Sequence, residues 1–154
     1  MEDIYPTSTS SDTNNIYPYE PIECLTILKS PLVRRKVYLM NERSEILGYA
    51  VSWWNKQDSE EFLLDKNRPI GGNMATSRLD VYRELVQVNY GTNSILENYF
   101  LSHQNNNSSN NEQFIPSCTG LWCRYYLMWR NGKPLNLIYE VFSPLLEKYM
   151  GKCM

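Results

Sequence analysis

The chain has 154 residues, of which 42% are hydrophobic and 13% aromatic, and its formal net charge is −2. This length and apolar content are sufficient for one domain with a core of its own. The near-neutral charge argues against a protein that its overall charge draws to nucleic acid or to anionic membranes. No stretch reaches the roughly 18 consecutive apolar residues that indicate a membrane-spanning helix.

The N-terminal segment, residues 1–20, is poor in apolar side chains and rich in Ser, Thr and Asn. Such a composition is typical of a loose terminus. We therefore expect a flexible N-terminal arm, followed by a single domain over residues 21–154. The chain opens with Met1-Glu2-Asp3-Ile4, which is acidic and unlike a secretory signal.

Three β-strands are predicted in the first half of the domain, at residues 22–29, 33–40 and 46–54. Ser30-Pro31 ends the first of them. The polar run 41–45 is typical of a turn, so the second and third strands are expected to pair as a hairpin. Residues 55–73 are charged and then glycine-rich, with Phe62-Leu63-Leu64 as a short buried segment.

Two helices are predicted to follow. The first begins with a capping-box-like Ser77 and Asp80, ends at Gly91, and carries residues at spacings of three and four, namely Leu79, Tyr82, Leu85, Val86 and Asn89. The second opens with Ser94 and Glu97 and carries Ile95, Leu96, Tyr99 and Phe100.

A polar tract separates these helices from the C-terminal part of the domain. Residues 104–112 contain no apolar side chain, so we predict a mobile loop over residues 104–117. Phe114 and Ile115 are an apolar pair at the end of this tract. Either they pack on the body and begin the next strand, or they bind another protein as an exposed aromatic anchor.

The C-terminal part is predicted to contain a second hairpin, with strands at residues 121–130 and 135–141. Asn131-Gly132 between them is a strong two-residue turn signal. Ser143-Pro144 then starts a terminal helix that Gly151 ends. The predicted fold is therefore α+β: an antiparallel sheet of hairpins packed against two to three helices, with a long polar loop.

Residues that carry chemistry are scarce. The single histidine, His103, could form a nucleophilic dyad with Cys118 or Cys123, but no nucleophile signature or glycine-rich phosphate loop is present. The four cysteines lack the paired spacing of a zinc site and are expected to be free thiols. We therefore predict no enzyme activity and no catalytic, cofactor-binding or metal-binding residues.

Basic residues cluster in two places, at Arg34-Arg35-Lys36 and on the second hairpin at Arg124, Arg130 and Lys133. Aromatic side chains beside such clusters can stack on nucleic-acid bases. Adjacent strand residues point to opposite faces, however, so Trp53-Trp54 and Tyr125-Tyr126 each supply at least one core residue. Direct nucleic-acid binding is therefore disfavoured.

The α+β body and the Asn/Ser-rich loop that ends in Glu112-Gln113-Phe114-Ile115-Pro116 resemble the N-terminal suppressors of RNA interference of dicistroviruses, the family of cricket paralysis virus. The resemblance implies a non-enzymatic viral protein in the host cytoplasm. It would bind and inhibit Argonaute-2 through Glu112, Gln113, Phe114 and Ile115. The alternative is a silencing suppressor that binds double-stranded RNA.

Suppressors of this kind are similar to adaptors that recruit a Cullin ubiquitin ligase through Elongins B and C. The terminal helix offers the Pro144-Leu145 start of the Elongin-contacting box, but Tyr149 and Cys153 replace its cysteine and its aliphatic residue. Leu145 and Tyr149 are therefore the candidate ligase contacts. The alternative is that Leu145, Leu146 and Tyr149 pack into the core.

Overall fold

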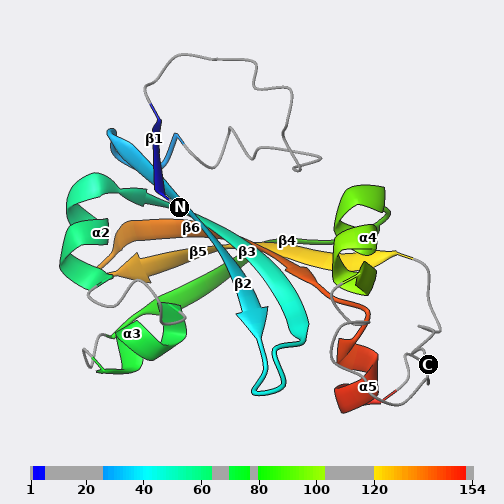
Figure 1. Cartoon of the computed structure of the whole chain (residues 1–154). Helices are drawn as coiled ribbons and strands as arrows, with labels where there is room; N and C mark the ends of the chain where they lie inside the picture. Colours follow the sequence, from blue (N-terminus) through cyan, green and yellow to red (C-terminus); the bar gives the residue numbers. More distant parts are fainter. Residues whose placement is uncertain (1, 6–25, 64–69, 77–79, 103–119, 152–154) are drawn as a thin grey trace.

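A computed structural model describes residues 2–5, 26–63, 70–76, 80–102 and 120–151. Its strands are β1 (Glu2–Tyr5), β2 (Leu32–Met40), β3 (Ile46–Asn55), β4 (Tyr82–Gly91), β5 (Leu121–Arg130) and β6 (Lys133–Phe142). Its helices are α2 (Lys56–Phe62), α3 (Ile70–Thr76), α4 (Ser94–Ser102) and α5 (Leu146–Met150). The described strands form one antiparallel sheet in the order β1-β2-β3-β6-β5-β4 (Figure 1). The predicted α+β class, an antiparallel sheet with helices packed on it, is confirmed.

Both predicted hairpins are present. In the β2–β3 turn the Asn41 side-chain oxygen accepts hydrogen bonds from the backbone N–H groups of Arg43 and Glu45, at 2.9 and 3.0 Å. In the β5–β6 turn Asn131 and Gly132 have φ angles of 51° and 71°. These positive angles match the two-residue turn whose twist suits a hairpin.

The helix predicted up to Gly91 is wrong, because β4 (Tyr82–Gly91) occupies this region and pairs with β5. A bulge between Leu85 and Gln87 interrupts the alternation of β4. Leu85 and Val88 therefore fall on one face although they are three residues apart, which imitates a helical spacing in the sequence. Pairing with β5 decides the outcome, as tertiary context often does.

Other local predictions meet mixed outcomes. The strand predicted at 22–29 is wrong for its described residues, since residues 26–31 form turns and bends, and β1 is the strand that pairs with the edge of β2.

The second predicted helix is confirmed as α4, although its cap is Asn93, whose Oδ1 accepts the Leu96 N–H at 3.0 Å. The terminal helix ends before Gly151 as predicted, but it begins at Leu146 and not at Pro144. The predicted loop 104–117 lies outside the described residues.

Each face of the sheet carries its own apolar cluster. The first, called the α4 face, gathers Tyr49, Val51 and Trp53 of β3 with Leu96 and Phe100 of α4. On the opposite side, called the α2/α3 face, Trp54 and Ile138 pack with Phe62, Leu63 and Met74. Figure 1 shows α2 and α3 on one side and α4 on the other. Trp53 and Trp54, which are successive residues of β3, therefore belong to different apolar clusters.

Candidate functional site

The residues predicted to contact partners do not form a site in the described part of the chain. Glu112, Gln113, Phe114 and Ile115 lie outside the described residues. Leu145 is 2% exposed and belongs to the core, whereas 44% of Tyr149 is exposed. The Tyr149 hydroxyl bonds Glu45 of the β2–β3 hairpin, so this residue attaches α5 to the hairpin. The core-packing alternative therefore holds for Leu145 and not for Tyr149.

A polar cluster lies on the α2/α3 face, in the middle of the sheet. Glu140 of β6 faces Arg124 in the adjacent strand β5. The Arg124 Nε and Nη2 atoms lie 2.7 and 2.6 Å from Glu140 Oε2. The Tyr126 hydroxyl donates to the other carboxylate oxygen, Oε1, at 2.8 Å. Both oxygens of Glu140 therefore have donors, and the carboxylate is held in one orientation.

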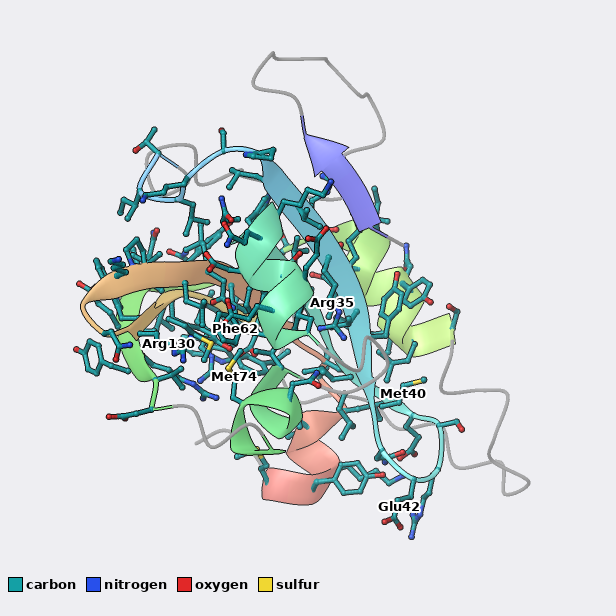
Figure 2. All side chains as sticks on the ribbon, turned by 90° about the vertical axis from the view of Figure 1, so that its left-hand side faces the viewer. Arg35, Met40, Glu42, Phe62, Met74 and Arg130 are labelled. Carbon is teal, nitrogen blue, oxygen red and sulfur yellow. The ribbon has the colours of Figure 1, made fainter. Side chains whose placement is uncertain are left out.

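Guanidinium groups from three strands share this face. The guanidinium carbons of Arg83 in β4 and Arg124 in β5 lie 5.6 and 5.3 Å from the centre of the Tyr126 ring. Arg35 of β2 is 4% exposed and lies on the same face, in the cross-strand row of Tyr126. In that row Arg35 pairs with Ser52, Ser52 pairs with Ile138, and Ile138 pairs with Tyr126. Figure 2 shows Arg35 on the side of the sheet that α2 and α3 cover. Such groups favour carboxylate ligands, which they bind through two parallel hydrogen bonds.

The phenol of Tyr126 stays protonated at physiological pH. Burial is the main cause that raises its pKa well above the ordinary value of 10, and the negative charge of Glu140 raises it further. Tyr126 is therefore a permanent hydrogen-bond donor to the carboxylate and not a general base.

Helix α3 reaches the cluster through its first turn. A Cβ atom at Gly71 would lie 3.8 Å from an Nη atom of Arg83, so the backbone of α3 lies next to this guanidinium. The side chains of Phe62 and Met74 cover the adjoining part of the sheet (Figure 2). The cluster thus lies beside a covered apolar region, as in many ligand sites, where a few polar groups adjoin apolar walls.

A cleft on the α4 face has different chemistry. Its volume is about 380 Å³, and Leu96, Tyr125 and Tyr139 are among the residues that line it. None of the described lining residues carries a charge. We therefore place the candidate site at the Glu140 cluster, because acid–base chemistry and the binding of charged ligands need charged or proton-donating groups. No three His, Cys, Asp or Glu side chains gather as metal ligands in the described segments.

Sequence reasoning missed this site, although β6 carries a signal for it. Residues 135–142 read Leu-Asn-Leu-Ile-Tyr-Glu-Val-Phe, so Asn136 and Glu140 are strongly polar residues in an apolar strand. Both lie on the same face because they are four residues apart. The basic run was also misleading, since Arg34 and Arg35 point to opposite faces of β2.

Comparison with known proteins identifies the family. The model of the family described as "Chorismate pyruvate-lyase Rv2949c-like" matches residues 7–150. The chain belongs to this family. Three algal relatives, each called "uncharacterized protein ycf21", are similar to it: from Cyanophora paradoxa (32% identity), Pyropia yezoensis (36%) and Porphyra purpurea (33%). The matches cover 78%, 76% and 92% of the chain and 54%, 59% and 71% of the relatives. The chain thus spans little more than half the length of the first two.

A solved structure supports the fold. The C-terminal domain of YurK from Bacillus subtilis matches with a TM-score of 0.50 and 15% identity, covering 93% of this chain and 86% of that domain. At this identity the likeness concerns the fold alone. It agrees with an antiparallel sheet covered by helices.

Membership of the chorismate pyruvate-lyase-like family corrects the functional predictions. The resemblance to dicistrovirus suppressors is wrong, because the family model matches residues 7–150 and the relative from Porphyra purpurea covers 92% of the chain. The inhibition of Argonaute-2, the alternative of double-stranded RNA binding and the recruitment of a Cullin ligase through Elongins fall with it. The host cytoplasm is also wrong as a location, since the relatives are algal. A short Asn/Ser-rich loop was too common a feature to identify a family.

Proposed function

We propose that the α2/α3 face binds chorismate, or a close relative of it, and releases pyruvate from the bound molecule. Two observations support this proposal. The family is named for chorismate pyruvate-lyases. The face carries Arg35, Arg83 and Arg124 from three strands, and Arg124 binds the oriented carboxylate of Glu140. The proposal depends mainly on this cluster, because the arginines can bind the carboxylates of a ligand and the Glu140 carboxylate can accept a hydrogen bond from it.

The chemistry of chorismate suits these groups. The molecule carries a ring carboxylate, a ring hydroxyl and an enolpyruvyl ether with a second carboxylate. Breaking the ether C–O bond on the ring side leaves the bonding electron pair on the departing enolpyruvate. The ring carbon that bears the hydroxyl then loses its proton, which makes the ring aromatic, and the enolpyruvate takes up a proton at its methylene carbon to give pyruvate. The products are 4-hydroxybenzoate and pyruvate, which together contain all atoms of the substrate.

The residues of the face have separate roles in this scheme. Arg35 and Arg83 bind the carboxylates and stabilise the charge that develops on the leaving group, as preorganised cations do in many enzymes. Glu140 accepts a hydrogen bond from the ring hydroxyl, and Arg124 and Tyr126 hold its carboxylate in place. A site of this kind orients the substrate in addition to stabilising charge. The algal relatives support a plastid as the location.

Pyruvate release from chorismate tests the proposal. We expect the chain to produce equal amounts of pyruvate, measured by coupled reduction to lactate, and 4-hydroxybenzoate, measured by chromatography. Arg35→Gln and Glu140→Gln are each expected to lower the rate by about 100-fold or more, as the loss of one charge-stabilising group does elsewhere.

Arg34→Gln is the matched control, because Arg34 adjoins Arg35 in β2 and is similarly buried but faces the α4 side. Its melting temperature is measured first, and Lys36→Gln, also on the α4 face, replaces it if the variant does not fold. Equal rate losses in Arg34→Gln and Arg35→Gln would contradict the proposal.

The sequence-based expectation that the chain is not an enzyme stays a prediction and gives the rival outcome. It predicts that chorismate binds, or fails to bind, without any release of pyruvate. Binding that Arg35→Gln weakens, with no turnover in the wild type, would make the face a sensor or carrier site for the same ligand.

A further inference from the structure

One side chain of the α2/α3 face stands out because its polar atoms are not satisfied. Asn136 lies in β6 and is 0% exposed. Within the described part of the chain neither its Nδ2 nor its Oδ1 has a hydrogen-bond partner. Its cross-strand neighbours are Trp54 and Met128, which both belong to the apolar cluster. Such an amide is unusual, because nearly all buried polar groups in proteins are paired.

The surroundings do not compensate the amide. The Trp54 Nε1 atom already donates to the Ser52 Oγ atom at 2.9 Å. A buried amide without partners lowers the stability of the folded state, whereas a leucine of similar size suits an apolar cluster. Asparagine at position 136 is therefore a disadvantage for folding. Proteins break such local rules mainly where a ligand binds.

The position of Asn136 connects it to the Glu140 cluster. The two residues are four positions apart on β6, which places their Cα atoms about 13 Å apart on the same face. Ile138 lies between them on that face. Met128 pairs with Asn136 on one side and with Arg83 on the other. The face thus has polar groups at both ends of an apolar floor, at a separation that suits an elongated ligand.

We propose that Asn136 is a ligand contact, and that its amide hydrogen-bonds an oxygen at the end of the ligand remote from Glu140. This inference rests on the proposed function and specifies the ligand as an organic acid with oxygen-bearing groups at both ends. Phe62 and Met74 belong to the apolar cluster that surrounds the row of Asn136. The ligand reaches the amide when these side chains give way, for which the unbranched methionine is well suited.

Two unreactive probes separate the ends of the site. The first, 3-(carboxymethoxy)benzoate, has a carboxylate at each end, and the second, benzoate, has one. We expect Asn136→Leu to weaken binding of the longer probe by about 10-fold, as for one lost hydrogen bond, and to leave benzoate binding within about 2-fold. The melting temperature should rise. Isothermal calorimetry and thermal unfolding give these values.

Asn89→Leu is the control, because it removes an amide that lines the cleft on the α4 face. It is expected to leave both affinities unchanged. Unchanged affinity for the longer probe in Asn136→Leu, or a lower melting temperature, would overturn the inference while the proposed function stands. A wild-type chain that binds neither probe would overturn both.

Discussion

The Tyr126 hydroxyl donates a hydrogen bond of 2.8 Å to Glu140 across the β5–β6 pair, and this bond orients the carboxylate at the centre of the sheet. Arg124 binds the other oxygen of the same carboxylate. Because Tyr126 comes from the strand beside Glu140, the register of one hairpin sets the geometry of the candidate site.

Tyr126→Phe should therefore weaken both the fold and the site. The variant removes one hydrogen bond to a carboxylate, and we expect a loss of about 1–2 kcal/mol in the free energy of unfolding. Urea denaturation measures it. Tyr82→Phe in β4 is the control, since 66% of Tyr82 is exposed. Equal stability of the two variants would show that the bond to Glu140 contributes nothing.

Stability should fall in acid through Glu45. Hydrogen bonds from Tyr149 chiefly, and also from Asn41 and Lys148, lower the pKa of Glu45 from 4.5 to about 2. Since the folded pKa lies below the unfolded one, the stabilisation is present above pH 4.5 and is lost as the pH falls toward 2.

Tyr149→Phe should remove much of this pH dependence. Tyr149 and Lys148 are partly exposed, so solvent limits the effect to about 1–2 kcal/mol. The measurement is the free energy of unfolding at pH 6 and at pH 3 in both proteins. The same acid-induced loss in wild type and variant would rule out this origin.

The cap of α4 is a third test. Asn93→Ala should cost about 1 kcal/mol, because the Asn93 side chain accepts the Leu96 N–H at the first turn. Ser94→Ala should change the free energy of unfolding by less than about 0.5 kcal/mol. The opposite order would show that Ser94, at which the sequence places the helix start, and not Asn93, is the capping residue.

Substitution of glycine by alanine should lower stability in the β5–β6 turn but not at the end of β4. Gly132 has a φ of +71°, which an alanine adopts at a cost of about 1–2 kcal/mol. Gly91 has open space around its Cβ position and no positive φ, so Gly91→Ala should be neutral or slightly stabilising. Thermal unfolding of the two variants checks the difference. A Gly132→Ala variant as stable as Gly91→Ala would contradict the predicted turn strain.

Local patterns were enough for the two hairpins and for α4. The signals are the alternation of apolar residues in the strands, the Asn131-Gly132 turn and the spacing of Leu96 and Phe100. Each of them depends only on residues a few positions apart, so each can be found within one segment of the sequence. The strand β4 was missed because its bulge at Leu85 changes the spacing of its apolar residues. No local rule showed that β5 would pair with it.

The candidate site could not be predicted in this way. The composition of the chain points to residues 112–115. Glu140, Arg35 and Arg83 lie on three different strands, and only the pairing of those strands puts them on one face. Alternation along β6 shows that Asn136 and Glu140 share a face. Which arginines share it with them depends on the order and register of the sheet.

The amino-acid sequence is thus sufficient for the class of the fold, its hairpins and one helix, because these depend on neighbours along the chain. The three-dimensional arrangement settles β4, the two separate cores and the groups that surround Glu140. The physical reason is that a strand offers two faces, and the partners on each face are set by hydrogen-bonded register between distant segments.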